Sequence, residues 1–257
     1  MQFCGLLEKT INMKNKVCFF TPASSDREDE FVQMSNSLKK FHPDVPLFRW
    51  NDDKIKAYQD QHFFYRATPI IAKELFRDYD YVVKMDSDTI VTGDLSELWN
   101  GDFDVAVVNN SNPREFKAYN YQILDIHPYA YVNCGLVSMH SERFINHWLN
   151  LCFSEHFASY QMREQDLLNI MVHYGDYKVK KMDEGDSFYG LASKGYWSEI
   201  ELKDDKLFLA KGEEGWPDKD KWIKAIHFAG GNIPNKMNLH TKFQPEIVKV
   251  LKGYQNE

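Results

Sequence analysis

The sequence predicts a single α/β domain in which strands alternate with helices around an open sheet. The chain has 257 residues, 43% of them hydrophobic, which is enough for one large domain with a substantial core. Short apolar runs alternate with segments of helical spacing, and no linker divides the chain into two parts. We therefore expect one domain over residues 1–257, with residues 1–14 as a loosely ordered amino-terminal extension.

The amino-terminal half contains three expected strands, each a short apolar run. They are Lys16 to Phe20, Pro46 to Trp50 and Tyr81 to Met85. A polar turn after the first strand, which stops at Thr21-Pro22, is expected to begin a helix that runs to about Phe41. Thr68 is expected to cap a second helix with Pro69 at its first position.

The carboxyl-terminal half continues the alternation after a short helical turn at Leu95 to Trp99. A polar stretch over 109–128 is interrupted by Pro113 and predicts a lid beside a site, and a loop is expected over 183–205. The other expected strands are 103–108, 131–139, 177–182, 206–210 and 224–228, and the other expected helices are 141–157, 164–174 and 245–251.

Charge and the amino-terminal sequence limit the partners and the compartment. A formal charge of −7 argues against a basic face that binds nucleic acid. The amino end has only a short apolar stretch, Cys4 to Leu7, with Glu8 directly after it, so it fits neither a secretion signal nor a membrane span. We expect a soluble, cytoplasmic protein with no transmembrane segment and no nucleic-acid partner.

Two carboxylates follow the third expected strand, where Asp86-Ser87-Asp88 comes directly after Met85. Ligands of open α/β sheets collect beyond the carboxyl ends of strands, and two carboxylates one residue apart can share a hard cation such as Mg²⁺ or Mn²⁺. Three further copies of the spacing precede strands or lie in a charged stretch: Asp78-Tyr79-Asp80, Asp102-Phe103-Asp104 and Asp218-Lys219-Asp220. Position therefore favours Asp86 and Asp88 as metal ligands over ordinary turn acids.

Three other segments carry polar residues where a buried strand or helix start is usually apolar. They are Asn133 with Gly135, Glu164-Gln165-Asp166, and His227-Phe228-Ala229-Gly230. A lone histidine at a strand end is more often a hydrogen-bonded core residue than a ligand, so this segment alone leaves the role of His227 open. Taken with the acidic pair, the segments indicate one site.

The order of these motifs resembles glycosyltransferase family 8 and related GT-A enzymes over most of residues 16 to 240. Asp86-Ser87-Asp88-Thr89 resembles the family's metal-binding Asp-x-Asp, and the run from Tyr131 to Val137 resembles its Asn-x-Gly strand. Glu164 to Asn169 resembles its Asp-Gln segment, with Glu in the first place, and His227 to Gly230 resembles the start of its His-x-x-Gly motif. The resemblance implies a GT-A (Rossmann-like) fold, with a mixed, mainly parallel sheet flanked by helices.

The same resemblance implies a UDP-sugar donor, Mn²⁺ or Mg²⁺, and roles for individual residues. Asp86, Asp88 and His227 would bind the metal, while Gln165 and Asp166 would act catalytically by holding the transferred sugar and stabilising its developing positive charge. Lys236 follows His227 later than in the family's motif, so Arg66 is a second candidate for the diphosphate. The expected donor contacts are Thr21, Arg66, Asp86, Ser87, Asn133, Gly135, Glu164, Gly230 and Lys236.

The implied reaction moves a hexose from a UDP-sugar to an acceptor hydroxyl with retention of anomeric configuration; the acceptor is a glycan, a protein or a lipid-linked group. Two other functions use the same acidic pair. A nucleotidyltransferase shares the metal–phosphate chemistry, and a phosphatase of the haloacid dehalogenase type would use Asp86 as nucleophile and Asp88 as acid/base. That phosphatase motif usually follows the first strand, whereas here it follows the third, and this class offers no role for His227.

Overall fold

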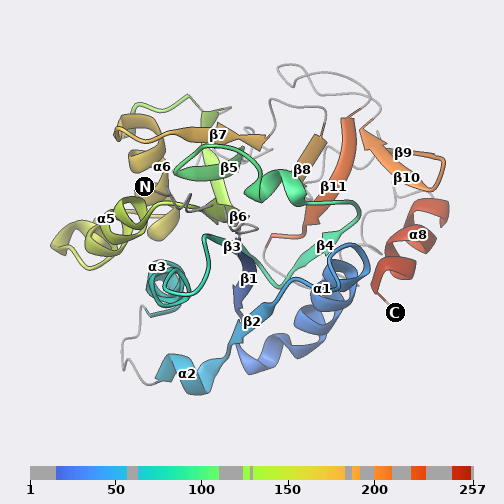
Figure 1. The fold of residues 1–257 in the computed structure, drawn as a ribbon, viewed down its shortest axis with the longest axis horizontal. Helices are drawn as coiled ribbons and strands as arrows, with labels where there is room; N and C mark the ends of the chain where they lie inside the picture. Colours follow the sequence, from blue (N-terminus) through green and yellow to red (C-terminus); the bar gives the residue numbers. More distant parts are fainter. Residues whose placement is uncertain are drawn as a thin grey trace, which may run out of the picture.

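The computed structural model describes residues 16–56, 63–109, 124–127, 130–182, 187–191, 200–209, 221–229 and 245–255. Within these residues the chain forms two sheets with helices packed against them (Figure 1). The larger sheet has the strand order β2-β1-β3-β6-β5-β7, and the smaller has the order β4-β11-β10-β9, with β8 paired to β11. The expected α/β class is confirmed.

The larger sheet is mixed. Its strands are β1 (Val17–Pro22), β2 (Leu47–Trp50), β3 (Tyr81–Met85), β5 (Val105–Asn109), β6 (Val132–Met139) and β7 (Val179–Lys181). β1 runs parallel to β2 and β3, and β5 runs parallel to β7, while β6 is antiparallel to both β3 and β5. Parallel strands buried on both faces explain the continuous apolar runs in the sequence.

Helices cover both faces of this sheet. Successive residues of β1 point to opposite faces, so Cys18 and Phe20 belong to one core cluster and Phe19 to another. The first cluster is completed by α3, α5 and α6, and the second by α1 and a 3-10 turn, η2. The helices are α1 (Glu28–Phe41), α2 (Asp52–Lys56), α3 (Phe63–Leu75), α5 (Glu142–Cys152), α6 (Glu164–Tyr174) and α8 (Pro245–Gln255), and the 3-10 turns are η1 (Ser25–Arg27), η2 (Ser96–Trp99) and η5 (Glu155–Ser159).

The smaller sheet lies beside the larger one and is covered by α8. Its strands are β4 (Thr89–Val91), β8 (Ser187–Leu191), β9 (Ile200–Lys203), β10 (Lys206–Leu209) and β11 (Lys221–His227). Ile247 and Leu251 of α8 pack in one cluster with Ile90 of β4 and Ile226 of β11. Only Asp86-Ser87-Asp88 separates β3 from β4, so the chain passes from one sheet to the other at the acidic pair (Figure 1).

Three local expectations are wrong. Pro69 lies inside α3, which already includes Phe63, because burial of the apolar side of this helix outweighs the one backbone hydrogen bond that proline removes. α5 ends at Cys152, and η5 follows where a continuous helix to Phe157 was expected. The expected loop over 183–205 contains β8 and β9, which complete the smaller sheet.

Most of the expected lid over 109–128 falls outside the described residues, so it stays a prediction. Among the helices that the structure describes, none is both long enough and apolar enough to cross a membrane.

Candidate active site

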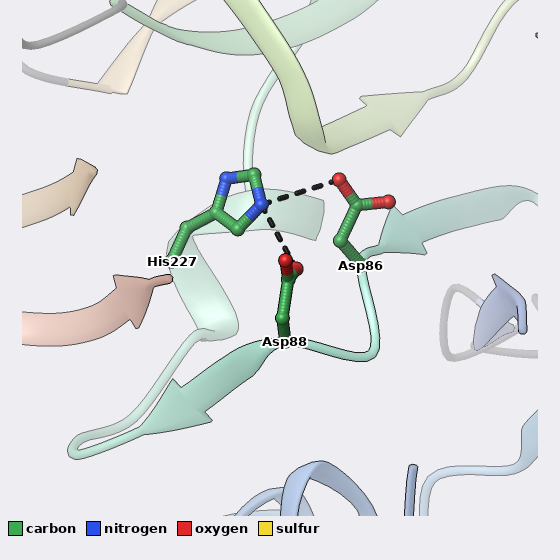
Figure 2. A group of neighbouring side chains, drawn as sticks. All are labelled: Asp86, Asp88 and His227. Carbon is green, nitrogen blue, oxygen red and sulfur yellow. Dashed lines mark ion pairs between the residues drawn. The ribbon is translucent and has the colours of Figure 1, made fainter. Parts of the chain in front are cut away.

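The acidic pair and His227 meet where the two sheets join. β4 and β11 run antiparallel with His227 opposite Thr89, and the backbone N–H of Phe228 donates to the carbonyl of Asp88 at 2.8 Å. This pairing brings the end of β11 beside the turn between β3 and β4. Figure 2 shows the imidazole of His227 facing both carboxylates. Residues far apart in the sequence therefore form one group.

The three side chains are close enough to hold a single metal ion. Nε2 of His227 lies 3.3 Å from Oδ2 of Asp86 and 3.0 Å from Oδ1 of Asp88 (Figure 2). All three candidate ligand atoms lie within 4.8 Å of one another. Burial lowers the pKa of His227, but the carboxylates of Asp88 and Asp86 raise it by more, so the pKa lies above its ordinary value. A divalent cation would replace the proton that this arrangement attracts to the imidazole.

Gly135 fixes the distance between β6 and this group. A Cβ at position 135 would overlap Cε1 and Nδ1 of His227 and would lie 2.6 Å from Oδ1 of Asn133. The carbonyl of Gly135 also accepts a hydrogen bond from the backbone N–H of Asp86 at 2.8 Å. Gly135 thus contacts the acidic turn through its backbone, and the absence of a side chain leaves room for the imidazole of His227.

Lys84 lies behind Asp86 and was not expected to take part in the site. Its side chain is buried, and its ammonium donates to Oδ1 of Asp86 and, at 2.6 Å, to the carbonyl of Cys134. Burial lowers the pKa of Lys84, but Asp86 raises it by more, so the ammonium keeps its charge. The one signal in the sequence was a charged residue in an otherwise apolar strand, two residues before Asp86.

Gln165 and Asn133 form a hydrogen-bonded floor beside the acidic pair. Oε1 of Gln165 accepts from Nδ2 of Asn133 at 3.1 Å and from the backbone N–H of Cys134 at 3.0 Å. Oδ1 of Asn133 accepts from the N–H of Gly135 at 2.6 Å. These bonds join the start of α6 to β6 and hold both amides at the edge of the cleft.

Asp166 lies below this floor. It is fully buried, and its two oxygens accept from the hydroxyl of Tyr131 at 2.6 Å and the backbone N–H of Met162 at 2.9 Å. Asn169, one turn further along α6, pairs its amide with both backbone groups of Val132. These contacts attach α6 to β6, so Asp166 supports Gln165 from beneath.

Glu164 faces the same interior as Lys84. Its Oε1 accepts from Sγ of Cys134 at 3.8 Å, and its Oε2 has no hydrogen-bond partner among the described residues. Burial raises the pKa of Glu164 to about 8, although the charge of Lys84 lowers it. Below that pH the group is mainly a neutral carboxylic acid.

An open cleft of about 640 Å³ runs past the acidic pair. Of the residues expected at the donor, Ser87, Asn133 and Gln165 lie on its wall, whereas Thr21 is fully buried. The wall also includes residues of the turn after β1, of α1 and α3, and of the approach to α6. No pattern in the sequence singled out Glu30, Tyr65 or Met162. The residues lining the cleft are Pro22, Ala23, Ser24, Asp26, Arg27, Glu30, Tyr65, Asp86, Ser87, Asp88, Asn133, Met162, Gln165, His227 and Ala229.

The cations expected at the diphosphate are found elsewhere or are not described. Nε of Arg66 donates to the carbonyl of Cys152 at 2.8 Å, and its guanidinium stacks on Phe153 and Phe157, so it is committed to the end of α5. Gly230 and Lys236 fall outside the described residues. Arg27, which pairs with Glu30 at 2.9 Å, is an arginine on the wall of the cleft.

Comparison with known proteins bears on the family and the fold of the chain. The profile of glycosyl transferase family 8 matches residues 6–232. The fold is similar to that of the galactosyltransferase LgtC in complex with donor and acceptor sugar analogues, at 14% identity and a TM-score of 0.54 over 91% of this chain and 99% of that one. An active-site variant of LgtC with glutamine replaced by glutamate gives 16% identity and a TM-score of 0.60 over 94% of this chain and 96% of that one.

The fold is also similar to that of the bifunctional glycosyltransferase WbbM without ligands, at 16% identity and a TM-score of 0.59. That match covers 94% of this chain but 52% of WbbM, so the chain spans about half the length of that protein. No curated protein sequence matches the chain. At these identities the solved structures support the fold, and the family profile supports the enzyme class.

Proposed function

Because the chain belongs to glycosyl transferase family 8, we propose that it transfers a hexose from a UDP-sugar to an acceptor hydroxyl, with metal dependence and with retention of anomeric configuration. The observation that carries the proposal is the convergence of Asp86, Asp88 and His227 at the wall of the cleft. The family match sets aside the phosphatase and nucleotidyltransferase alternatives, which share only the acidic pair.

The donor atoms fit a hard divalent cation. Two carboxylate oxygens and one imidazole nitrogen suit Mn²⁺ or Mg²⁺ better than softer metals, which favour thiolates. The space opposite Gly135 lets the imidazole approach both carboxylates at the observed distances. When bound, the metal would neutralise the diphosphate as it leaves the sugar. Asp86, Asp88 and His227 would hold it, and Ser87 lies between them on the wall of the cleft.

Gln165 is the candidate for the sugar face of the site. Its Oε1 is fixed by Asn133 and Cys134, so this oxygen lies in a set position beside the cleft where positive charge would develop on the sugar. The LgtC variant that replaces an active-site glutamine supports a role for glutamine in such enzymes. Asp166 would act only through Gln165, because it is fully buried and does not line the cleft.

Retention is supported because each carboxylate on the described wall of the cleft belongs to the metal site or already has a partner. An inverting enzyme needs a general base that touches the acceptor, and Asp166, the first candidate, is fully buried. Among the described wall residues, Asp86 and Asp88 belong to the metal site, Asp26 accepts from Ser24, and Glu30 pairs with Arg27. The leaving phosphate would then receive the proton of the acceptor. Lys236, Gly230 and the uridine preference stay predictions.

A thermal-shift experiment tests the metal and the nucleotide together. UDP at about 100 times its Kd stabilises the folded state by about 2.7 kcal/mol, which is roughly 5–10 °C for a domain of this size. We expect this shift with Mn²⁺ present and little or none in EDTA, since the diphosphate and the acidic pair repel each other without a cation. An equal shift in EDTA would contradict the metal assignment. Proton NMR of the anomeric proton in the glycoside product tests retention.

A further inference from the structure

Lys84 is the buried cation closest in sequence to the acidic pair, and its surroundings are unusual for a lysine. Its relative exposure is 3%, in a strand whose other residues are all buried too. Burying an ammonium is unfavourable unless an anion and further hydrogen bonds accompany it. Here the anion is Asp86 and the second acceptor is the carbonyl of Cys134. The chain therefore keeps a permanent positive charge directly behind one carboxylate of the proposed metal site.

The contacts divide the two oxygens of Asp86 between two partners. Lys84 holds Oδ1, while Oδ2 faces Nε2 of His227 at 3.3 Å. Only Oδ2 is therefore directed toward the position where a cation would bind. Lys84 fixes the rotamer of Asp86 and also cancels its charge as long as no metal is present.

We propose that Lys84 is a resident counter-ion that stabilises the metal-free site and opposes the binding of free divalent cation, so that the metal binds mainly as its complex with the nucleotide diphosphate. This inference rests on the proposed function and concerns the order in which the same site fills. With Lys84 the site carries one net negative charge from Asp86 and Asp88 when His227 is neutral. Free metal would leave it positively charged, whereas the diphosphate restores the balance.

Two effects of removing Lys84 oppose each other, and their sizes decide the outcome. A carboxylate that bridges an ammonium and a metal places them about 5 Å apart, from ordinary hydrogen-bond and metal–oxygen lengths. At that distance the repulsion weakens metal binding by about tenfold at the dielectric constant of water, and by far more at the effective value of about 20 for protein sites. Loss of an orienting hydrogen bond to a ligand costs roughly 10–100-fold. At the effective value for protein sites, the charge effect is the larger one.

The test compares Lys84→Met with wild type in two measurements. In EDTA we expect the melting temperature of Lys84→Met to fall, because Asp86 loses its counter-ion. Without nucleotide we expect Mn²⁺ affinity, measured by electron paramagnetic resonance of free Mn²⁺, to rise by at least about tenfold. Affinity for the Mn²⁺–UDP complex should change much less, since the charges of metal and diphosphate largely cancel. A lysine that only positions Asp86 would instead lower both stability and Mn²⁺ affinity.

Lys180→Met is the matched control. Nζ of Lys180 donates to the carbonyls of Glu97 and Asn100 at 2.7 and 2.9 Å, outside the acidic pair, so its loss should lower stability and leave Mn²⁺ affinity unchanged. Lys84→Gln, which removes the charge but keeps a donor, serves if Lys84→Met does not fold, with the same expected rise. Unchanged or weaker Mn²⁺ binding in both Lys84 variants would overturn the inference alone. Absence of Mn²⁺-dependent UDP binding in wild type would overturn the proposed function as well.

Discussion

Replacing Gly135 with alanine tests whether His227 is held against β6. The added methyl group would overlap the imidazole and lie 2.6 Å from Oδ1 of Asn133, whereas ordinary contacts of a Cβ begin at 3.4 Å. Asn133 would have to retreat by the difference, 0.8 Å, and the imidazole by more. Neither can move freely, because Asn133 is bonded to Gln165 and Gly135, and His227 ends a paired strand.

The size of the effect follows from these displacements. Overpacking a filled interior costs about 1–3 kcal/mol, which lowers the melting temperature by roughly 2–12 °C in a domain of this size. Misplacing a reacting group by about 1 Å costs on the order of 100-fold in rate. We therefore expect Gly135→Ala to remain folded at 25 °C, to bind UDP with Mn²⁺ at least about tenfold more weakly, and to lose about 99% of transferase activity.

The assay combines thermal melting in EDTA with titration of UDP in the presence of Mn²⁺. Gly253→Ala is the control, because a Cβ at position 253 of α8 meets nothing within 4 Å. That change should be neutral or stabilise the helix by up to about 1 kcal/mol, with binding unchanged. Wild-type Mn²⁺-dependent binding in a folded Gly135→Ala would refute the placement of His227 against β6.

Two further predictions concern carboxyl groups. Asp88→Asn should reduce Mn²⁺-dependent activity by at least about 100-fold. Asp104→Asn should keep most of the activity, because the carboxylate of Asp104 accepts from the N–H of Lys178, away from the acidic pair. Comparable losses in a kinetic assay would mean that the wrong pair was assigned. Burial raises the pKa of Glu164 to about 8, so the folded state binds this proton more tightly than the unfolded state does. The stabilisation is complete below about pH 4 and is lost as the pH rises through 8, with a slope of up to about 1.4 kcal/mol per pH unit in between. Denaturant unfolding should show this slope flattened in Glu164→Gln and unchanged in Glu155→Gln, since the side chain of Glu155 is 87% exposed.

The acidic pair could be located from the sequence because its position depends on local order. An apolar run that ends in two carboxylates predicts a strand and the ligand-facing end of that strand together, and both expectations agree with β3 and the turn after it. The same reasoning distinguishes Asp86-Ser87-Asp88 from the other three Asp-x-Asp segments, which precede strands or lie in a charged stretch. Asp104, for example, precedes β5, and its backbone N–H pairs with Lys178.

The partners of the acidic pair could not be located in this way. His227 reaches Asp88 through the register of β11 on β4, and pairing between strands so distant in sequence leaves no periodicity to detect. β4 itself has three residues and was not expected. The role of Lys84 depends on the direction in which the carboxylate of Asp86 points. A lysine within an apolar run does not reveal that direction.

Asp166 illustrates the opposite difficulty, because its neighbour Gln165 lines the cleft and Asp166 does not. Successive residues of a helix point in directions about 100° apart, so Gln165 and Asp166 cannot both face the same ligand. The helix directs Gln165 to the wall of the cleft and Asp166 to Tyr131 and Met162. A helix over 164–174 therefore allows only one of Gln165 and Asp166 to contact the ligand directly.

The site depends on both sheets, and this follows from where the chain changes sheet. β3 supplies Lys84 and ends at Met85, directly before Asp86; β4 begins after Asp88, and β11 brings His227 to the junction. The larger sheet alone holds one carboxylate, its counter-ion and the floor formed by Gln165. The smaller sheet adds the imidazole, and the N–H of Phe228, directly after β11, holds the backbone carbonyl of Asp88. A metal held by the three proposed ligands would therefore stabilise the contact between the sheets, because the ligands come from both sides of it and the ion can bind all three only while they remain together.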